Sequence, residues 1–313
     1  MLNYLNTENM NIQIISPKFI LENKVPYIKP EKIIINNFEY TFNKKISNGT
    51  YGHVYLYSYY KNKIAIKIGN TIEDLYCDII VLDKLKGKKY NDMIVESIIC
   101  DYEYTFSNKK YPTKIIIMEY YDGNILDFVH GIFNDMDDNA KYMFILNIIK
   151  QIILSVKFLL NNGLFFADIT PNNILYKNLS FYNVKLVLCD LGSAFPINNS
   201  YCVTFPSIKN KLSDGNIENI TESDLIWSTC ITMFYLLVDK KTLSFSKICD
   251  TFLYKYIKNK NDDEIQNQIN IIKNIVLSKN IDENIKKIYN NIFCMMTDKI
   301  FELSLEDFLI YFD

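Results

Sequence analysis

The first third of the chain has the alternation of apolar and polar positions that is typical of β-strands. Short runs rich in β-branched and aromatic residues predict strands at residues 40–46, 54–60, 63–68 and 114–118. One helix, at residues 72–85, interrupts them and carries leucines at helical spacing. Asp78 lies on the same apolar stripe, and a carboxylate that faces inward needs a partner.

After residue 122 the pattern becomes mainly helical. A stripe that runs from Ile145 to Leu160 ends at Asn161-Asn162-Gly163, a helix stop signal. Residues 225–238 are apolar on nearly all sides, which predicts a buried helix, and the polar runs 258–263 and 278–284 predict loops between C-terminal helices. The pattern therefore predicts an α+β fold, with a small β-rich lobe followed by a larger helical lobe.

The first 37 residues differ from the rest. They mix polar and apolar positions around Pro17, Pro26 and Pro30, which predicts an irregular leader with no chemistry of its own.

Composition narrows the class of protein. A chain of 313 residues that is 49% hydrophobic forms a compact body, and a net charge of −2 disfavours nucleic-acid and membrane-surface partners. We expect a cytoplasmic protein for three reasons. The seven cysteines are scattered without close pairs, no signal-peptide pattern is found, and the longest apolar stretch is too short to span a bilayer. No arginine occurs, so all 34 basic residues are lysines. This bias is typical of AT-rich coding, and if the source is a virus we expect the host cytoplasm.

Two glycines lie between predicted strands in the segment 46–54. Gly49 and Gly52 would let backbone amides approach phosphate oxygens, although an ordinary hairpin turn has the same pattern. Further on, Lys67 ends the apolar run Ile64-Ala65-Ile66-Lys67. A buried ammonium needs anions around it, which Asp78 and phosphates would supply. The alternative is a lysine at a strand edge that reaches solvent.

The second group of polar residues follows the long helix. Asp168 and Asn173 are five residues apart, just after the predicted helix stop. A strand-like run at residues 185–189 then leads to Asp190-Leu191-Gly192, which alone would be a turn. Asp224 opens the buried helix, where Ser223 or Asp224 is the predicted N-cap.

Taken in order, these segments resemble a eukaryotic-type protein kinase of the serine/threonine type. They are similar to its glycine-rich loop, strand lysine, helix acid, hinge, catalytic loop and Asp-Phe-Gly segment. Asp224 also resembles the aspartate that anchors the catalytic-loop backbone in this family, which is compatible with a role as N-cap. The resemblance implies a bilobal protein-kinase-like fold with a leader at residues 1–37, an N-lobe at 38–118, a hinge at 119–123 and a C-lobe at 124–313.

The resemblance also implies roles for individual residues. Asp168 would orient the attacking hydroxyl, Lys67 and Asn173 would complete the catalytic set, and Asn173 and Asp190 would hold Mg. The expected ATP-binding residues are Ser47, Gly49, Gly52, Val54, Ala65, Lys67, Asp78, Met118, Glu119 and Tyr121. Met118 is the expected gatekeeper, and the segment from Glu119 to Tyr121 would contact adenine through its backbone.

The chain departs from the family pattern in the N-lobe. Ser47 stands where the first glycine is usual, and Asp78 stands where a glutamate is usual. Either the helix lies closer to Lys67, or Glu73 substitutes for Asp78, or the ion pair is weak.

Further departures lie in the C-lobe. Phe166, Ala167 and Thr170 replace the histidine, arginine and lysine of the catalytic loop, and only Phe205-Pro206-Ser207 remains of the Ala-Pro-Glu motif. Without the arginine, switching by activation-segment phosphorylation is not expected.

The resulting hypothesis is an ATP- and Mg-dependent protein kinase acting on serine or threonine of a protein substrate. Pro171 favours this type over tyrosine kinases. The alternatives are a pseudokinase that binds nucleotide or serves as a scaffold, and a small-molecule kinase of related fold. The sequence does not define the oligomeric state.

Overall fold

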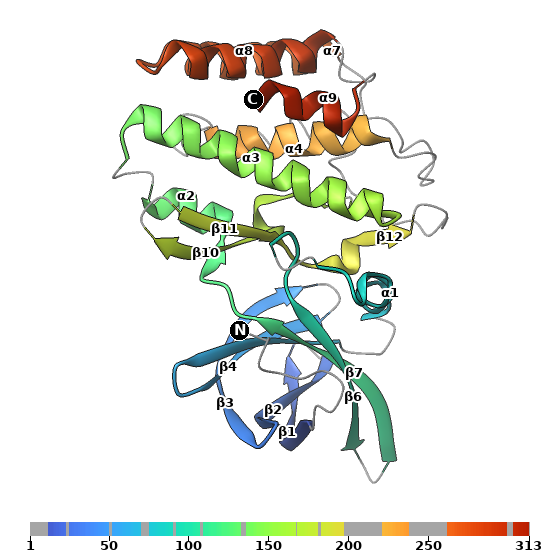
Figure 1. The fold of residues 1–313 in the computed structure, drawn as a ribbon. Helices are drawn as coiled ribbons and strands as arrows, with labels where there is room; N and C mark the ends of the chain where they lie inside the picture. Colours follow the sequence, from blue (N-terminus) through green and yellow to red (C-terminus); the bar gives the residue numbers. More distant parts are fainter. Residues whose placement is uncertain are drawn as a thin grey trace. The chain divides into compact units, whose positions relative to one another are not determined.

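The computed structural model divides the chain into two compact units (Figure 1). Unit 1 comprises Met1–Tyr121 and Asp190–Gly192, and unit 2 comprises Asp122–Cys189 and Ser193–Asp313. The structure describes residues 12–22, 25–49, 52–69, 75–89, 92–106, 109–132, 136–166, 168–180, 183–196, 221–237, 262–298 and 303–312.

Unit 1 is built on one seven-stranded sheet with the order β1-β2-β3-β4-β5-β7-β6. All its neighbouring strands are antiparallel. The strands are β1 (Ile12–Glu22), β2 (Val25–Ile35), β3 (Phe38–Gly49), β4 (Gly52–Tyr59), β5 (Asn62–Ile68), β6 (Ser97–Phe106) and β7 (Lys109–Glu119). The four predicted strands are therefore confirmed, whereas β1, β2 and β6 were not predicted.

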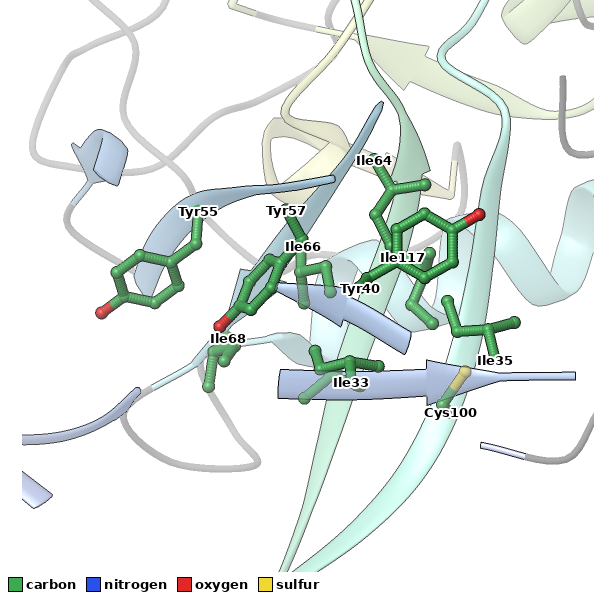
Figure 2. Close-up of a cluster of buried hydrophobic side chains, with 11 residues drawn as sticks. Ile33, Ile35, Tyr40, Tyr55, Tyr57, Ile64, Ile66, Ile68, Cys100 and Ile117 are labelled. Carbon is green, nitrogen blue, oxygen red and sulfur yellow. The ribbon is translucent and has the colours of Figure 1, made fainter. Parts of the chain in front are cut away.

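The two faces of this sheet carry different side chains, because successive side chains of a strand point to opposite sides. In β5, Ile64, Ile66 and Ile68 belong to a buried apolar cluster, while Ala65 and Lys67 alternate with them. The cluster is called the back-face cluster below (Figure 2). It consists of Ile33, Ile35, Tyr40, Tyr55, Tyr57, Ile64, Ile66, Ile68, Cys100, Ile115 and Ile117.

The prediction of an irregular leader is wrong for residues 12–35, which form β1 and β2. Proline removes a backbone donor but leaves the extended conformation intact, so it is tolerated where no ladder bond is needed. Pro17 lies on β1, the edge strand, and Pro26 and Pro30 precede the part of β2 that pairs with β3, Lys32–Ile35.

The turn between β2 and β3 explains how the leader joins the sheet. Asn36 and Asn37 both have positive φ, 49° and 68°. Two such residues make the turn that matches the twist of a two-residue hairpin, and asparagine tolerates this conformation well. The leader is therefore tied to β3 by a tight local hairpin.

The helix of unit 1 is α1 (Tyr76–Leu85). Residues 72–74 of the predicted helix lie outside the described residues. The predicted stripe is confirmed, because Leu75, Asp78, Leu82 and Leu85 are all buried.

Unit 2 is mainly helical, with two small sheets, β11-β10-β8 and β12-β9. Together with the β-rich unit 1 it confirms the predicted α+β class. Its helices are α2 (Ile125–Ile132), α3 (Asp138–Asn161), α4 (Glu222–Leu237), α7 (Asp262–Leu277), α8 (Glu283–Asp298) and α9 (Leu305–Leu309). Its strands are β8 (Gly123–Asn124), β9 (Leu164–Phe166), β10 (Ile174–Ser180), β11 (Asn183–Leu188) and β12 (Ala194–Pro196).

Helix α3 packs along the core of unit 2. It begins after Asp137, whose side chain accepts a hydrogen bond from the Ala140 N–H, and ends before Gly163, whose φ is +70°. Within the described residues it is the helix that is long and apolar enough to span a bilayer, with a mean hydropathy of 1.9. It contacts α4, β9 and β11, so core packing accounts for its apolar face.

Helix α4 confirms the predicted buried helix: every residue from Ser223 to Leu237 is buried. The helix starts at Glu222, one residue before the first of the two predicted N-cap positions. Thr221 precedes its first residue, and Asp224 Oδ2 accepts hydrogen bonds of 2.8 Å from both the Thr221 N–H and its hydroxyl. Thr221 is thus the residue that precedes the helix, and Asp224 lies in the first turn and accepts its hydrogen bonds. The predicted N-cap at Ser223 or Asp224 is wrong.

We predict that Gly52→Ala destabilises the protein by about 1–3 kcal/mol. Gly52 has φ +147°, and a Cβ atom there would lie 2.5 Å from the carbonyl oxygen of Ile68, a backbone atom that cannot rotate away. Urea unfolding measures the change. Gly131→Ala is the matched control, because nothing lies within 4 Å of that Cβ position in α2. Equal stability of parent and Gly52→Ala would contradict the prediction.

Candidate active site

Lys67 lies at the centre of a buried ionic cluster in unit 1. Only 7% of the residue is exposed. Its Nζ donates to both carboxylate oxygens of Asp78, at 3.1 and 2.9 Å, and to Asp190 Oδ1 at 2.8 Å. The alternative of a lysine that reaches solvent is therefore wrong, and the structure brings the three predicted residues together.

Asp78 reaches Lys67 directly, although it is one methylene shorter than the glutamate of the family pattern. It is 4% exposed, and α1 lies close enough to β5 for two-oxygen contact. Of the three possibilities left by the sequence, the structure therefore favours a closer helix; Glu73 lies outside the described residues.

Gly192 completes this cluster through its backbone. Its N–H donates a hydrogen bond to the Asp78 carboxylate. A Cβ atom at position 192 would lie 3.1 Å from Asp78 Oδ2 and 3.4 Å from Asp190 Oδ1. A side chain at position 192 would therefore press on Asp78, whereas its contact with Asp190 would be an ordinary one.

The electrostatics of the cluster follow from one cation between two anions. Burial alone lowers the pKa of Lys67, but attraction to Asp78 and Asp190 outweighs it and raises that pKa to about 12. Burial raises the pKa of Asp78, and the Asp190 charge adds to this, while Lys67 and the Gly192 N–H oppose it. Lys67 is therefore protonated throughout the physiological range.

Asp190 adopts a left-handed backbone conformation, with φ +55°. Aspartate tolerates this region better than most residues. Its side chain is 43% exposed, although one oxygen accepts from Lys67. The carboxylate can therefore take a further ligand.

The predicted glycine loop connects β3 and β4. Ser47 pairs with Val54 and Gly49 with Gly52, while Thr50 and Tyr51 lie outside the described residues. Val54 also pairs with Lys67 across β4 and β5. The segment is thus a hairpin, which fits both the turn and the phosphate-loop interpretation.

The predicted hinge residues lie at the end of β7. Met118 pairs with Ala65 of β5. The Glu119 N–H donates to the Glu96 carbonyl at 3.0 Å, and the Tyr121 hydroxyl donates to Glu119 Oε2 at 3.1 Å. Burial, with the Glu119 charge next, raises the pKa of Tyr121, which keeps this hydroxyl a donor. The hydrogen bond between the Tyr121 and Glu119 side chains therefore stabilises the last residues of the first segment of unit 1.

Asp168 and Asn173 are brought together in unit 2. Asn173 Nδ2 donates to Asp168 Oδ2 at 2.6 Å and to the Asp168 carbonyl at 3.2 Å. The Thr170 N–H donates to the same carbonyl at 2.9 Å. Ala167 lies outside the described residues. Since the Asn173 amide nitrogen faces Asp168, its amide oxygen is the atom available to a cation.

Two contacts fix this loop to the rest of unit 2. The Thr232 hydroxyl of α4 donates to the Ile169 carbonyl, and the Cys189 N–H donates to the Asn173 carbonyl at 2.9 Å. Phe166, which replaces the usual histidine, is fully buried in β9. Thr232 was not predicted; the available signal was a hydroxyl in a largely apolar helix, which needs a partner, and Ser228 and Thr229 of the same helix carry it too.

The donor atoms suit magnesium rather than a softer metal. Within the described residues, no group of three or more His, Cys, Asp or Glu side chains could form a protein cage for a metal. Mg²⁺ does not require such a cage, because one or two protein oxygens and substrate phosphates satisfy it. The Asp190 carboxylate of unit 1 and the Asn173 amide of unit 2 are oxygen donors of this kind.

Comparison with known proteins agrees with these geometries. The family model described as "Protein kinase domain" matches residues 40–301. A curated relative, a probable serine/threonine-protein kinase of Dictyostelium discoideum, is 27% identical over 247 residues, which cover 72% of this chain and 50% of that protein. The chain thus spans about half the length of this relative.

We predict that Lys67→Met lowers the free energy of unfolding by about 3–5 kcal/mol, because it leaves Asp78 buried without its cation. Adding Asp78→Leu should restore part of the loss, since it removes the stranded charge. Urea unfolding of the parent and both variants measures this. Lys114→Met, which breaks the exposed ion pair with Asp101, is the control and should change stability far less. A double variant no more stable than Lys67→Met would contradict the account.

Removing Lys67 should also make stability depend on pH. Without Lys67, burial raises the pKa of Asp78 further. A carboxyl whose folded-state pKa lies above its unfolded value stabilises the fold when protonated, and this contribution is lost as pH rises through the folded-state pKa. In the parent, the contribution of Lys67 to the free energy of unfolding is kept up to about pH 10. We therefore expect the stability difference between parent and Lys67→Met to grow from about pH 4 to pH 8 in urea titrations. A constant difference would contradict this.

Proposed function

We propose, for a chain that belongs to the protein kinase domain family, that it transfers the γ-phosphate of ATP to serine or threonine hydroxyls of a protein substrate. The observation that carries this proposal is the buried Lys67, held by Asp78 and Asp190. An ammonium fixed by two carboxylates is a preorganised positive charge, and phosphoryl transfer depends mainly on positioning and charge neutralisation.

The proposed roles in unit 1 concern the nucleotide. Lys67 would bind phosphate oxygens, and the hairpin from Ser47 to Val54 would offer backbone amides to them. Ala65 and Met118, which pair across β5 and β7, would border the adenine, and the backbone of Glu119 to Tyr121 would bind it. Asp78 would hold Lys67 in place.

The proposed roles in unit 2 concern the attacking hydroxyl. Asp168 would accept its proton or orient it, and the hydrogen bond from Asn173 keeps the Asp168 carboxylate in a defined position. Asn173 and Asp190 would hold Mg²⁺, which when bound supplies positive charge at the transferring phosphate. Within unit 2, the Thr232 hydroxyl of the buried helix α4 donates to the Ile169 carbonyl and so holds the loop that carries Asp168 and Asn173.

Two observations support serine/threonine specificity. Pro171 in the loop resembles the serine/threonine form, and the curated relative is described as a probable serine/threonine-protein kinase. Phosphoamino-acid analysis that finds only phosphotyrosine would contradict this part of the proposal.

A pseudokinase is the second candidate, favoured by Thr170. The family pattern has a lysine there, and the loss of one charged contact to the transferring phosphate costs about 1.5–3 kcal/mol, or roughly ten- to a hundred-fold in rate. Such a chain would bind ATP and regulate a partner. The intact set of Lys67, Asp168, Asn173 and Asp190 favours the active enzyme.

The deciding experiment measures transfer of labelled γ-phosphate from Mg-ATP to casein, to a basic protein and to the chain itself. We expect transfer by the parent, and a loss of at least about a hundred-fold in Asp168→Asn and Lys67→Met. Asp127→Asn is the control, because this carboxylate is exposed on α2, and it should keep the parent rate.

Thermal shift with Mg-ATP separates the remaining outcomes. No transfer with Mg-dependent ATP binding would favour the nucleotide-binding pseudokinase. No transfer and no binding would favour a scaffold that has kept only the fold.

A further inference from the structure

The leader strands complete the core of unit 1. The back-face cluster draws residues from β2, β3, β4, β5, β6 and β7. Ile33 and Ile35 of β2 are fully buried, and they belong to the same cluster as Cys100 of β6 (Figure 2). The matched family segment begins only at residue 40, so these two isoleucines are additions from the leader.

A buried polar contact also ties the leader to the sheet. The hydroxyl of Tyr57, itself fully buried in the cluster, donates to the carbonyl of Pro30 at 2.6 Å. If the leader left the sheet, this hydroxyl would lose its acceptor, and the back-face cluster would lose Ile33 and Ile35. Both changes oppose detachment.

The leader further brings the two edges of the sheet together. β1 and β6 are the edge strands in the sheet order, yet they also lie in contact. The sheet therefore curves, so that the leader strand β1 comes near β6.

This arrangement bears on Lys67 through strand alternation. Ile66 and Ile68 flank Lys67 in β5 and point into the cluster, so their packing fixes the strand from which Lys67 projects to the other side. We infer that residues 12–35 are an integral support of unit 1, which holds the Lys67 strand from its back face, and that loss of this support opens unit 1 locally. The inference is independent of whether the chain transfers phosphate.

Cys100 offers a direct readout of that opening. It is 8% exposed within the cluster, and burial, with the Asp101 charge next, raises the pKa of its thiol to about 12. It is therefore nearly unreactive while the leader is in place. Cys230 of α4 is fully buried in unit 2 and serves as an internal control in the same molecule.

The experiment follows the alkylation of both thiols by N-ethylmaleimide in the full chain, located by peptide mass spectrometry under native conditions. The test variant is Ile33→Ala/Ile35→Ala. The matched control is Ile34→Ala, which alternates with them on β2 and is only partly buried. We expect Cys100 to react at least about tenfold faster in the test variant, with Cys230 unchanged and with Ile34→Ala like the parent.

Two results would overturn the inference. Cys100 reacting at the parent rate would mean that the leader does not support the core. Cys100 and Cys230 accelerating by the same factor would mean that the whole chain, and not unit 1, responds. If the double variant does not fold, Ile35→Val applies the same test with an expected increase of about two- to tenfold.

Discussion

An ammonium group cannot be buried without anions around it, and the position of Lys67 makes this the controlling constraint on unit 1. α1 must lie near β5 so that Asp78 can reach Lys67 with both oxygens. A Cβ atom at residue 192 would press on the Asp78 carboxylate, at 3.1 Å from Oδ2. Asp190, which accepts from the same ammonium, has a left-handed backbone conformation. These separate backbone features meet at Lys67.

The strict two-residue period of β-strands separates packing from chemistry. In β5 the isoleucines supply the core and Lys67 supplies the charge, and neither role interferes with the other. The same separation holds in unit 2, where α4 is buried on all sides but lends the Thr232 hydroxyl to the Ile169 carbonyl. The apolar core thus positions the polar groups.

Local patterns in the sequence were sufficient for the strands 40–68, the α1 stripe and the buried α4, because each depends on periodicity within one segment. The pairing of Lys67 with Asp78 was also predictable, since two buried opposite charges need each other. The leader was missed because Pro17, Pro26 and Pro30 indicate interruption, whereas their effect depends on which strand edge they face. Thr232 was missed because its hydroxyl is one of several in the buried part of α4 and its partner lies 63 residues away, so the pattern does not identify the bond.

The short side chain of Asp78 has an entropic consequence. Aspartate has one fewer side-chain torsion than glutamate, so fixing it against Lys67 gives up less rotamer freedom. The distance between the backbones of α1 and β5 must be set more precisely, because a shorter side chain tolerates less displacement of α1 from β5. The contact is thus either fully made or lost with a small shift of the helix, and α1 has little room to slide while Lys67 stays bound.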